Sequence, residues 1–358
     1  MRKKIHNLYD TIYHPLNLWG AYKNAARGKR YQPAAATFEY DLEKNLLEIE
    51  QELKEGTYQP GGYNSFHIQK PKKRLINAAP FRDRVVHHAL MSVIEPLFEQ
   101  QFIFDSYANR KRKGSHAALD RCTYYMRRKN YVMHMDVRQF FPSIDHQILL
   151  GILSRTIGDE RVLQLVEKII ASGNGVQACE YEMVYFAGDD LFALYRPRGL
   201  PIGNLTSQHW ANVYLNELDQ YAKRVLKCRA YIRYVDDILL FADDRESLHD
   251  LKQRIIMFLQ TLRLTLHETK AQPRPTWTGL SFLGFQVFFD HRRLKPANGY
   301  AFQRRLLGML SGMQSGRVGR EKFQSSLQSW LNHASYGNTW GLRRAILANT
   351  GIDGGPHE

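Results

Sequence analysis

The most informative segment of the chain is Tyr231-Ile232-Arg233-Tyr234-Val235-Asp236-Asp237-Ile238-Leu239-Leu240-Phe241. Strand-forming residues flank two adjacent aspartates on both sides, which predicts two short strands around a tight acidic turn over residues 230–242. Two carboxylates at the end of buried strands repel each other, so their burial is costly without a cation. A hydrated surface turn is the alternative for the dipeptide alone, but the apolar flanks favour a metal-binding turn.

A second acidic strand end lies upstream, in Val132-Met133-His134-Met135-Asp136-Val137-Arg138-Gln139-Phe140-Phe141. Asp136 closes an apolar strand that we expect over residues 131–136. Aspartates at the ends of neighbouring strands can share two Mg²⁺ ions, an arrangement that serves in-line nucleotidyl transfer. Carboxylates are also the ligands that Mg²⁺ prefers. Asp136, Asp236 and Asp237 are therefore the candidate metal ligands.

Further blocks surround these aspartates, and together they resemble the reverse transcriptase family. The Tyr-Val-Asp-Asp turn resembles the metal-binding motif of the palm in that family. The other blocks follow in the family's order: Ile68-Gln69-Lys70-Pro71, Arg74-Leu75-Ile76 and residues 83–86 in the fingers; residues 136–141 and 143–146 in the palm; residues 199–208 beneath the incoming nucleotide; and residues 264–270 and 282–285 in the last palm block and primer grip. The resemblance covers residues 60–290 and implies an RNA-directed DNA polymerase.

The resemblance also implies a fold and a division of the chain. The fold class is α+β, a right-hand polymerase whose palm is an antiparallel sheet with helices on one face. The expected parts are an N-terminal helical extension (1–60), fingers (61–130), a palm with finger insertions (131–295) and a small basic helical thumb (296–358). Within them we expect a helix over 38–53, a strand over 263–268, a hairpin over 280–295 and a helix that opens at Gln303.

Roles for single residues follow from the same resemblance. Asp136, Asp236 and Asp237 would hold two Mg²⁺ ions, with Mn²⁺ as an alternative, and the backbone carbonyl of Val137 would add a ligand. Lys70 and Arg74 would hold the triphosphate of the dNTP. The alternative for both is a solvated basic loop, and Lys72 and Lys73 are rivals of Lys70.

Five more residues have an expected role or location. Phe141 stands where the family places its steric gate, a ring that collides with a ribose 2′-hydroxyl and favours dNTPs, whereas Phe140 is expected in the core. Lys270 is either the general acid that protonates pyrophosphate or an exposed lysine. Asp145 and His146 are expected to cap the following helix.

One departure from the usual family pattern concerns Ile202 and Gly203. Many reverse transcriptases have glutamine before this glycine, whereas Ile-Gly-Asn-Leu-Thr-Ser-Gln resembles the enzymes of diversity-generating retroelements. That group copies a template RNA into cDNA, misincorporates opposite adenines and acts with a small basic, ring-forming accessory protein. Ile202 offers only apolar contact to the nascent base pair, and losing a positioned polar group should weaken discrimination between nucleotides.

Two other interpretations remain open. One is a related bacterial reverse transcriptase in a phage-defence system, and the other is a non-catalytic, maturase-like RNA-binding protein. The complete set of aspartates argues against the second interpretation, since RNA binding alone needs no converging carboxylates. Phe141 disfavours an RNA polymerase.

Composition agrees with a nucleic-acid enzyme. The 358 residues include 50 Lys and Arg against 35 Asp and Glu, a net charge of +15, which favours a polyanionic partner such as template RNA or a cDNA primer. No apolar run reaches the length of about 20 residues that a spanning helix needs, so no membrane contact is expected. The three cysteines show no metal or disulfide spacing, which fits a cytoplasmic protein.

Overall fold

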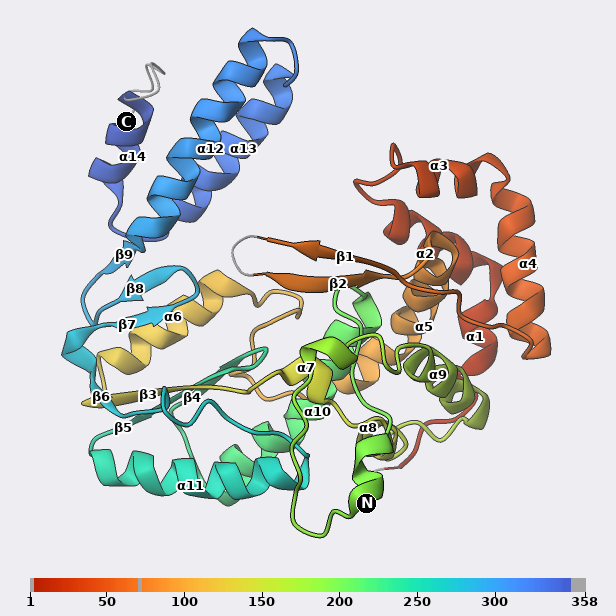
Figure 1. Cartoon of the computed structure of the whole chain (residues 1–358), viewed down its shortest axis with the longest axis horizontal. Coiled ribbons are helices and arrows are strands. Elements are labelled where there is room, and N and C mark those ends of the chain that lie inside the picture. The colour runs from red at the N-terminus through yellow and green to blue at the C-terminus, as the bar shows by residue number, and fades with distance from the viewer. Residues whose placement is uncertain (1–2, 70–72, 349–358) are drawn as a thin grey trace.

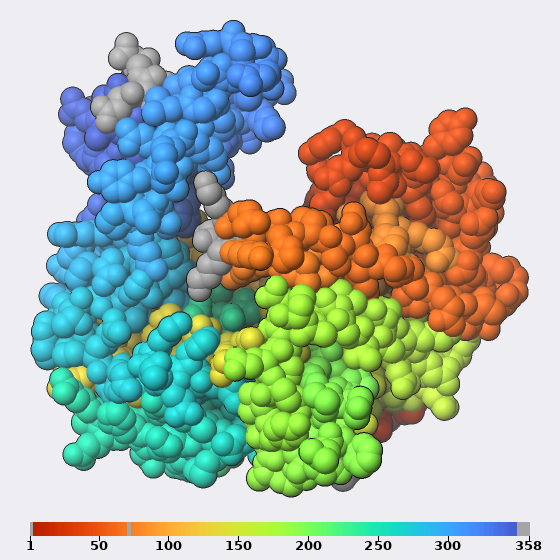
Figure 2. Space-filling view, viewed as in Figure 1, coloured from red at the N-terminus to blue at the C-terminus, as the bar shows by residue number. Residues whose placement is uncertain are grey.

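The computed structural model describes residues 3–69 and 73–348 of the chain. Figure 1 shows helices at the N-terminal end, a protruding β-hairpin, a central sheet between helices, and a C-terminal group of helices that stands apart from the N-terminal ones. In Figure 2 the space-filling surface is hollowed between the C-terminal helices and the hairpin. The expected α+β class is confirmed.

Four helices form the N-terminal part: α1 (Tyr9–Tyr13), α2 (Pro15–Ala26), α3 (Pro33–Tyr40) and α4 (Leu42–Glu55). The expected single helix over 38–53 is wrong, because Asp41 leaves the helical conformation and separates α3 from α4. Its apolar positions still face the core, where Phe38, Ile49 and Leu53 are buried. Gly56 ends α4 in the left-handed conformation, and its N–H bonds to carbonyls of the last turn.

The hairpin follows, with β1 (Asn64–Ile68) antiparallel to β2 (Arg74–Ala78). Ile68 pairs with Arg74 towards its tip, and Asn64 pairs with Ala78 at its base. The residues of β1 are exposed or half-buried, as expected for a two-stranded ribbon. Helix α5 (Phe81–Glu99) then runs through the core and packs against α2 and α10 (Leu205–Gln220).

The central sheet has the strand order β4-β5-β3-β6. Its members are β3 (Tyr131–Asp136), β4 (Tyr231–Tyr234), β5 (Asp237–Ala242) and β6 (Arg274–Pro275), and their pairing is antiparallel. The two strands expected around the acidic turn are thus confirmed.

Side chains alternate between the two faces of this sheet. Met133 and Leu240 enter one core with residues of α10 and α11 (Arg245–Thr261), while Val132 and Leu239 enter a second core with residues of α6 (Ser115–Met126). Both faces are therefore covered. Helices α7 (Phe140–Ser143), α8 (His146–Leu153) and α9 (Glu160–Ser172) complete the region before α10.

The expected strand over 263–268 is wrong. Arg263 turns the chain with a φ of +54° directly after α11, and the segment then meets β3 through the bridge between Val137 and Leu266. Two backbone bonds hold it there, from Arg138 N–H to the Thr265 carbonyl (2.8 Å) and from His267 N–H to the Asp136 carbonyl (2.9 Å). Residues 264–267 are therefore bonded to the end of β3, and we name this segment the clamp.

The C-terminal part, as far as Ala348, contains a third sheet and three helices. The sheet is an antiparallel meander of β7 (Leu280–Phe282), β8 (Phe285–Val287) and β9 (Arg292–Leu294), one strand more than the expected hairpin. The helices are α12 (Pro296–Gln314), α13 (Arg320–Ala334) and α14 (Trp340–Ala348). The expected helix start at Gln303 is wrong, since Pro296 takes the first helical position, which suits proline. Across residues 3–69 and 73–348, no helix combines the length and apolar character that crossing a membrane requires.

Candidate active site

The three aspartates meet at one end of the central sheet. Asp136, the last residue of β3, pairs directly with Asp237, the first residue of β5. Val235 and Asp236 form the turn between β4 and β5, and the N–H of Val137 donates to the Asp236 carbonyl at 3.3 Å. Residues that are about a hundred positions apart in the sequence are therefore neighbours in space, because antiparallel pairing aligns the two strand ends.

Burial and mutual repulsion act on this group of carboxylates. The pKa of Asp236 is raised to about 6, first by burial, then by the negative charge of Asp237, with a smaller contribution from Asp136. Desolvation and like charge both disfavour the ionised form. A bound cation would relieve both effects, so the electrostatics suit a metal site.

Two histidines flank the aspartates. His134, two residues before Asp136 on β3, has its Nε2 2.6 Å from Oδ1 of Asp237. On the other side, His267 Nε2 lies 4.0 Å from Oδ2 of Asp136. Sequence reasoning missed both histidines, although period-two alternation along β3 already places His134 and Asp136 on one face.

The turn itself has an unusual backbone. Val235 has a φ of +56°, a left-handed conformation that a β-branched residue rarely adopts. Such conformations persist where the surrounding structure enforces them, and they cluster at functional sites. Part of the enforcement comes from Arg233, whose Nη1 donates to the Val235 carbonyl at 3.2 Å.

Arg233 is in turn fixed by a buried ion pair. Its side chain and that of Asp219 on α10 are both fully buried, and Nη2 lies 2.7 Å from the Asp219 carboxylate. The guanidinium also donates to Asn212 Oδ1 (3.0 Å) and to Ser106 Oγ (3.1 Å). The Tyr231 hydroxyl donates to Asp219 at 2.7 Å. Sequence reasoning missed this network. The sequence offers one sign of it, because Arg233 is a charged residue inside an otherwise apolar strand.

Arg74 on the hairpin acts electrostatically on Asp236. It is the first residue of β2, it is exposed, and its positive charge acts to lower the pKa of Asp236. Lys70 and its rival Lys72 lie outside the described residues, and Lys73 is exposed.

The two phenylalanines after β3 differ in burial. Phe140 is 2% exposed and belongs to the core, as expected. Phe141 is half-buried against the same core, and its carbonyl accepts the Leu200 N–H at 2.9 Å. The segment before them is sharply bent, because Gln139 has a φ of +46°.

The segment with Ile202 and Gly203 lies against the base of the hairpin. The Ile202 carbonyl accepts the N–H of Asn77 at 2.9 Å, so the block and β2 are joined directly. Gly203 has a φ of +113°, and a Cβ there would stand 3.0 Å from Cγ2 of Ile76. Both the backbone angle and the close approach require glycine.

Asn77, which the sequence reasoning missed, is the centre of this junction. Its side chain is fully buried, donates to Ser65 Oγ at 2.8 Å and accepts from Gln177. Its carbonyl accepts from Asn204 Nδ2 at 3.0 Å. The hairpin is therefore anchored at its base and exposed along β1.

Lys270 lies on a turn that follows the clamp. It is exposed, and the buried Lys252 holds the turn through the carbonyls of Glu268 (3.0 Å) and Ala271 (2.9 Å). The backbone that carries Lys270 is thus fixed, while its side chain is open to solvent.

Asp145 and His146 differ in their roles at the start of α8. Asp145 accepts the N–H of Ile148 at 3.0 Å, so the expected cap of α8 is confirmed for this residue. The buried His146 instead has its Nε2 2.8 Å from the Gly199 carbonyl, and it joins α8 to the segment before Ile202.

The chemistry of the acidic end fits a divalent cation. Three carboxylates converge there, and the pKa of Asp236 is raised, so a cation would stabilise the ionised group. Within the described ranges, however, no three side chains of the His, Cys, Asp and Glu types already form a cage for an ion.

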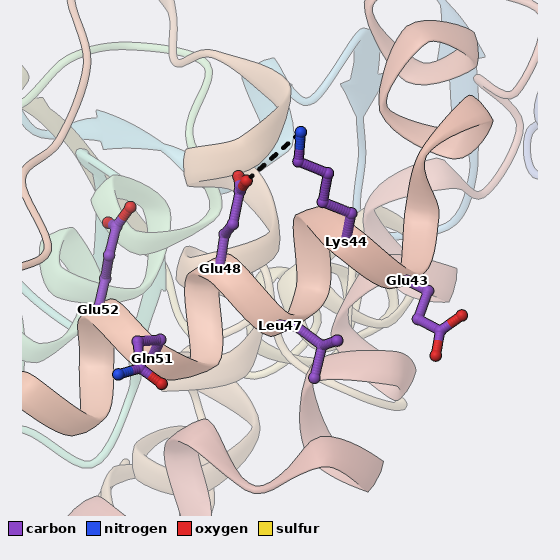
Figure 3. Close-up of a pocket in the computed structure, with 6 residues that line it drawn as sticks. All are labelled: Glu43, Lys44, Leu47, Glu48, Gln51 and Glu52. Carbon is purple, nitrogen blue, oxygen red and sulfur yellow. Dashed lines mark ion pairs between the residues drawn. The ribbon is translucent and has the colours of Figure 1, made fainter.

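A different hollow, drawn in Figure 3, carries none of these residues. It lies on the outer side of α4 and is lined by Glu43, Lys44, Leu47, Glu48, Gln51 and Glu52. Lys44 and Glu48 form an ion pair at 3.9 Å, one helical turn apart. This is the solvated side of a single helix, and it brings no catalytic groups together.

Comparison with known proteins identifies the family. Residues 64–287 match the family model described as reverse transcriptase (RNA-dependent DNA polymerase). The chain is 26% identical over 220 residues to the group II intron-encoded protein LtrA of Lactococcus lactis subsp. cremoris, covering 60% of this chain and 35% of that protein. It is 24% identical over 292 residues to the protein YkfC of Escherichia coli K12, covering 70% of this chain and 73% of that protein.

A solved structure of telomerase from Candida albicans, in complex with a fragment of telomeric RNA, is also similar. It shares 12% identity with a TM-score of 0.46, covering 81% of this chain and 55% of that chain. The chain spans 35% of the length of LtrA. The family match covers the aspartates, the hairpin and the segment with Gly203. The chain therefore belongs to the reverse transcriptase (RNA-dependent DNA polymerase) family, and its mixed helix and sheet architecture is consistent with a right-hand polymerase.

Proposed function

We propose that this chain is an active RNA-directed DNA polymerase that makes cDNA from an RNA template. The observation that carries the proposal is the pairing of Asp136 with Asp237 beside Asp236, whose pKa is raised to about 6 by burial and by its acidic neighbour. Burying neighbouring carboxylates lowers the stability of the fold, and RNA binding alone does not require them.

The proposed roles follow from position. Asp136, Asp236 and Asp237, with the carbonyl of Val137, would hold two Mg²⁺ or Mn²⁺ ions, which when bound supply the positive charge that nucleotidyl transfer requires. Arg74, and Lys70 beyond the described residues, would orient the triphosphate of the dNTP. Lys270 would protonate the pyrophosphate from the turn that Lys252 holds.

Primer extension on an RNA template tests the proposal. With Mg²⁺ and dNTPs, the wild type should extend a DNA primer, and Asp237→Ala should lower the rate by about a thousandfold or more, because an essential charge is removed from the transition state. Asp243→Ala is the matched control, since Asp243 lies just beyond the other end of β5 in an exposed ion pair with Lys129. Equal rates for wild type and Asp237→Ala would contradict the proposal.

We propose further that Phe141 selects the sugar. Its ring lies half-buried on α7, five residues after Asp136, and the resemblance to the family gives this position the role of the steric gate. Phe141→Ala should increase the incorporation of ribonucleotides relative to dNTPs, whereas Phe140→Leu, a core change, should leave that ratio unchanged. An unaltered ratio in Phe141→Ala would remove Phe141 from the site.

The proposed biological role is mutagenic cDNA synthesis in a diversity-generating retroelement. Its support is the segment Ile202 to Gln208, in which an apolar side chain replaces the usual glutamine. Sequencing of cDNA should show that Ile202→Gln makes fewer errors at template adenines. Identical error spectra would oppose this role for Ile202.

A partner and a location belong to the same proposal. The partner is a small basic accessory protein of the ring-forming type, as the resemblance to that group implies. The proposed location is cytoplasmic, in keeping with three free cysteines.

A second candidate is a maturase-like RNA-binding role. It is favoured by the similarity to LtrA, an intron-encoded protein, and by 29% identity over 87 residues to nuclear intron maturase 1 of Arabidopsis thaliana. RNA binding that survives in Asp237→Ala, together with no extension by the wild type, would support this candidate over the polymerase.

A further inference from the structure

Aromatic rings and cations alternate along one part of the surface, on α6 and the segments that flank it. It comprises Phe104, Lys113, Arg121, Tyr124 and Arg128, which we name the α6 stripe. Arg121 and Tyr124 are three residues apart on one side of α6, and Arg128 follows in the turn just after the helix. Phe104 and Lys113 extend the line from the loop before the helix.

The other sides of α6 are already occupied. Leu119 and Cys122 are fully buried in the second core. Asp120 and Thr123 are bound by Arg292 of β9, at 2.8 Å each. The α6 stripe therefore lies away from the second core, next to Asp120, whose side chain is 56% exposed and paired with Arg292.

Cations and rings are in direct contact along the stripe. Lys113 Nζ lies 3.4 Å from the centre of the Phe104 ring, and the Arg128 guanidinium lies 3.8 Å from that of Tyr124. Arg121 connects the two rings, at 5.5 Å from Phe104 and 4.9 Å from Tyr124. Phe104 is 67% exposed and Tyr124 is 40% exposed, so both rings keep area for a ligand.

The surroundings of the stripe add positive charge. Lys111, Arg112 and Arg127 are exposed beside it. A polyanion would therefore be attracted to this surface.

One buried acid, Asp105, offsets part of this charge. It is 3% exposed, and its carboxylate binds Arg121 of the stripe (2.8 Å) and Lys223 (2.9 Å). Two cations share this one carboxylate, so positive charge exceeds negative charge here.

We propose that the α6 stripe binds single-stranded RNA as a second nucleic-acid site, in addition to the polymerase cleft. Exposed rings next to cations are what unpaired bases stack on, while the cations neutralise phosphates. Double-stranded RNA keeps its bases stacked on one another, and an acidic peptide has no need of the rings. A template segment held here would remain attached while the cleft copies another part of the RNA.

Binding of a single-stranded probe to the full-length protein tests the proposal. The cleft is first saturated with a short RNA–DNA hairpin primer–template, and fluorescently labelled oligo(U) is then titrated. Phe104→Ala/Tyr124→Ala should weaken oligo(U) binding by about tenfold or more, because each stacked base contributes on the order of tenfold. Phe104→Tyr/Tyr124→Phe should retain binding, since both rings remain.

A matched control and a parallel assay make the result decisive. Tyr195→Ala/Arg254→Ala changes an exposed ring and an exposed cation elsewhere, and should bind oligo(U) like the wild type. Phe104→Ala/Tyr124→Ala should extend the short hairpin at the wild-type rate. This assay therefore distinguishes a loss of oligo(U) binding from a loss of polymerase activity. Undiminished oligo(U) binding, a matching loss of hairpin extension, or equal competition by double-stranded RNA would each overturn the proposal.

Discussion

Two antiparallel hairpins of this molecule are built in opposite ways. The β4–β5 hairpin lies inside a four-stranded sheet with a core on each face, and its turn is held by the buried Arg233. The β1–β2 hairpin forms a sheet of its own, exposed along β1 and fixed at its base through Asn77.

The difference suits the two proposed tasks. Metal ligands must keep fixed mutual positions, so their hairpin is supported by surrounding side chains whose own positions are locked. Groups that receive an incoming nucleotide have to admit it and then close on it, which an exposed ribbon on a fixed base permits. The comparison predicts large losses of stability from changes near the first hairpin and small ones near the tip of the second.

The largest expected effect is that of Asp219→Ala. This change leaves the Arg233 guanidinium buried without its carboxylate, and breaking a buried pair in this way costs about 3–5 kcal/mol. Urea unfolding should show a lower free energy of unfolding. Asp250→Ala, in an exposed ion pair of 3.8 Å on α11, is the control and should cost little. A small loss in Asp219→Ala would mean that the turn is not held through this pair.

An intermediate effect is expected for Asn77→Ala. Gln177 and Ser65 would lose a buried partner, which costs about 1–3 kcal/mol, and the base of the hairpin would loosen. The KM for dNTPs should therefore rise while the free energy of unfolding falls. Ser65→Ala removes one bond of the same network and should have a smaller effect on both measurements; the reverse order would show that Asn77 is not the centre of the junction.

The smallest effect on stability is expected at Arg74. The residue is exposed, so Arg74→Ala should change the free energy of unfolding by about 0.5 kcal/mol or less. Its effect on catalysis should be large, with kcat/KM for dNTPs falling about tenfold or more. Arg74→Lys should recover part of the loss because the charge is kept. An unchanged kcat/KM in Arg74→Ala would separate the hairpin from nucleotide binding.

The acidic strands could be predicted from the sequence, and physical reasons explain why. Apolar runs of strand formers next to Asp136 and Asp237 predict buried strands with acidic ends, and antiparallel pairing then brings the ends together. The supporting residues are harder to find. Asp219 lies on a helix, 14 positions before its partner Arg233, and nothing in either local pattern reveals their pairing.

Predicted boundaries were wrong where tertiary contacts overrode a local pattern. The residues around Leu266 have the composition of a strand, but Arg263 turns the chain and leaves only a bridge to Val137. Asp41 likewise interrupts an otherwise continuous helical periodicity. The anchoring of the hairpin by Asn77 depends on residues 100 and 127 positions away, which no periodicity encodes.

Gly203 has a mechanical consequence. Because a Cβ at this position would stand 3.0 Å from Ile76, the bare backbone sets the closest approach of the β1–β2 hairpin to the segment below it. A side chain here would push Ile76 away by a few tenths of an ångström and tilt the hairpin about its base. Arg74, towards the tip, would move further than the base, so a small displacement at Gly203 would be enlarged where we propose that the triphosphate binds.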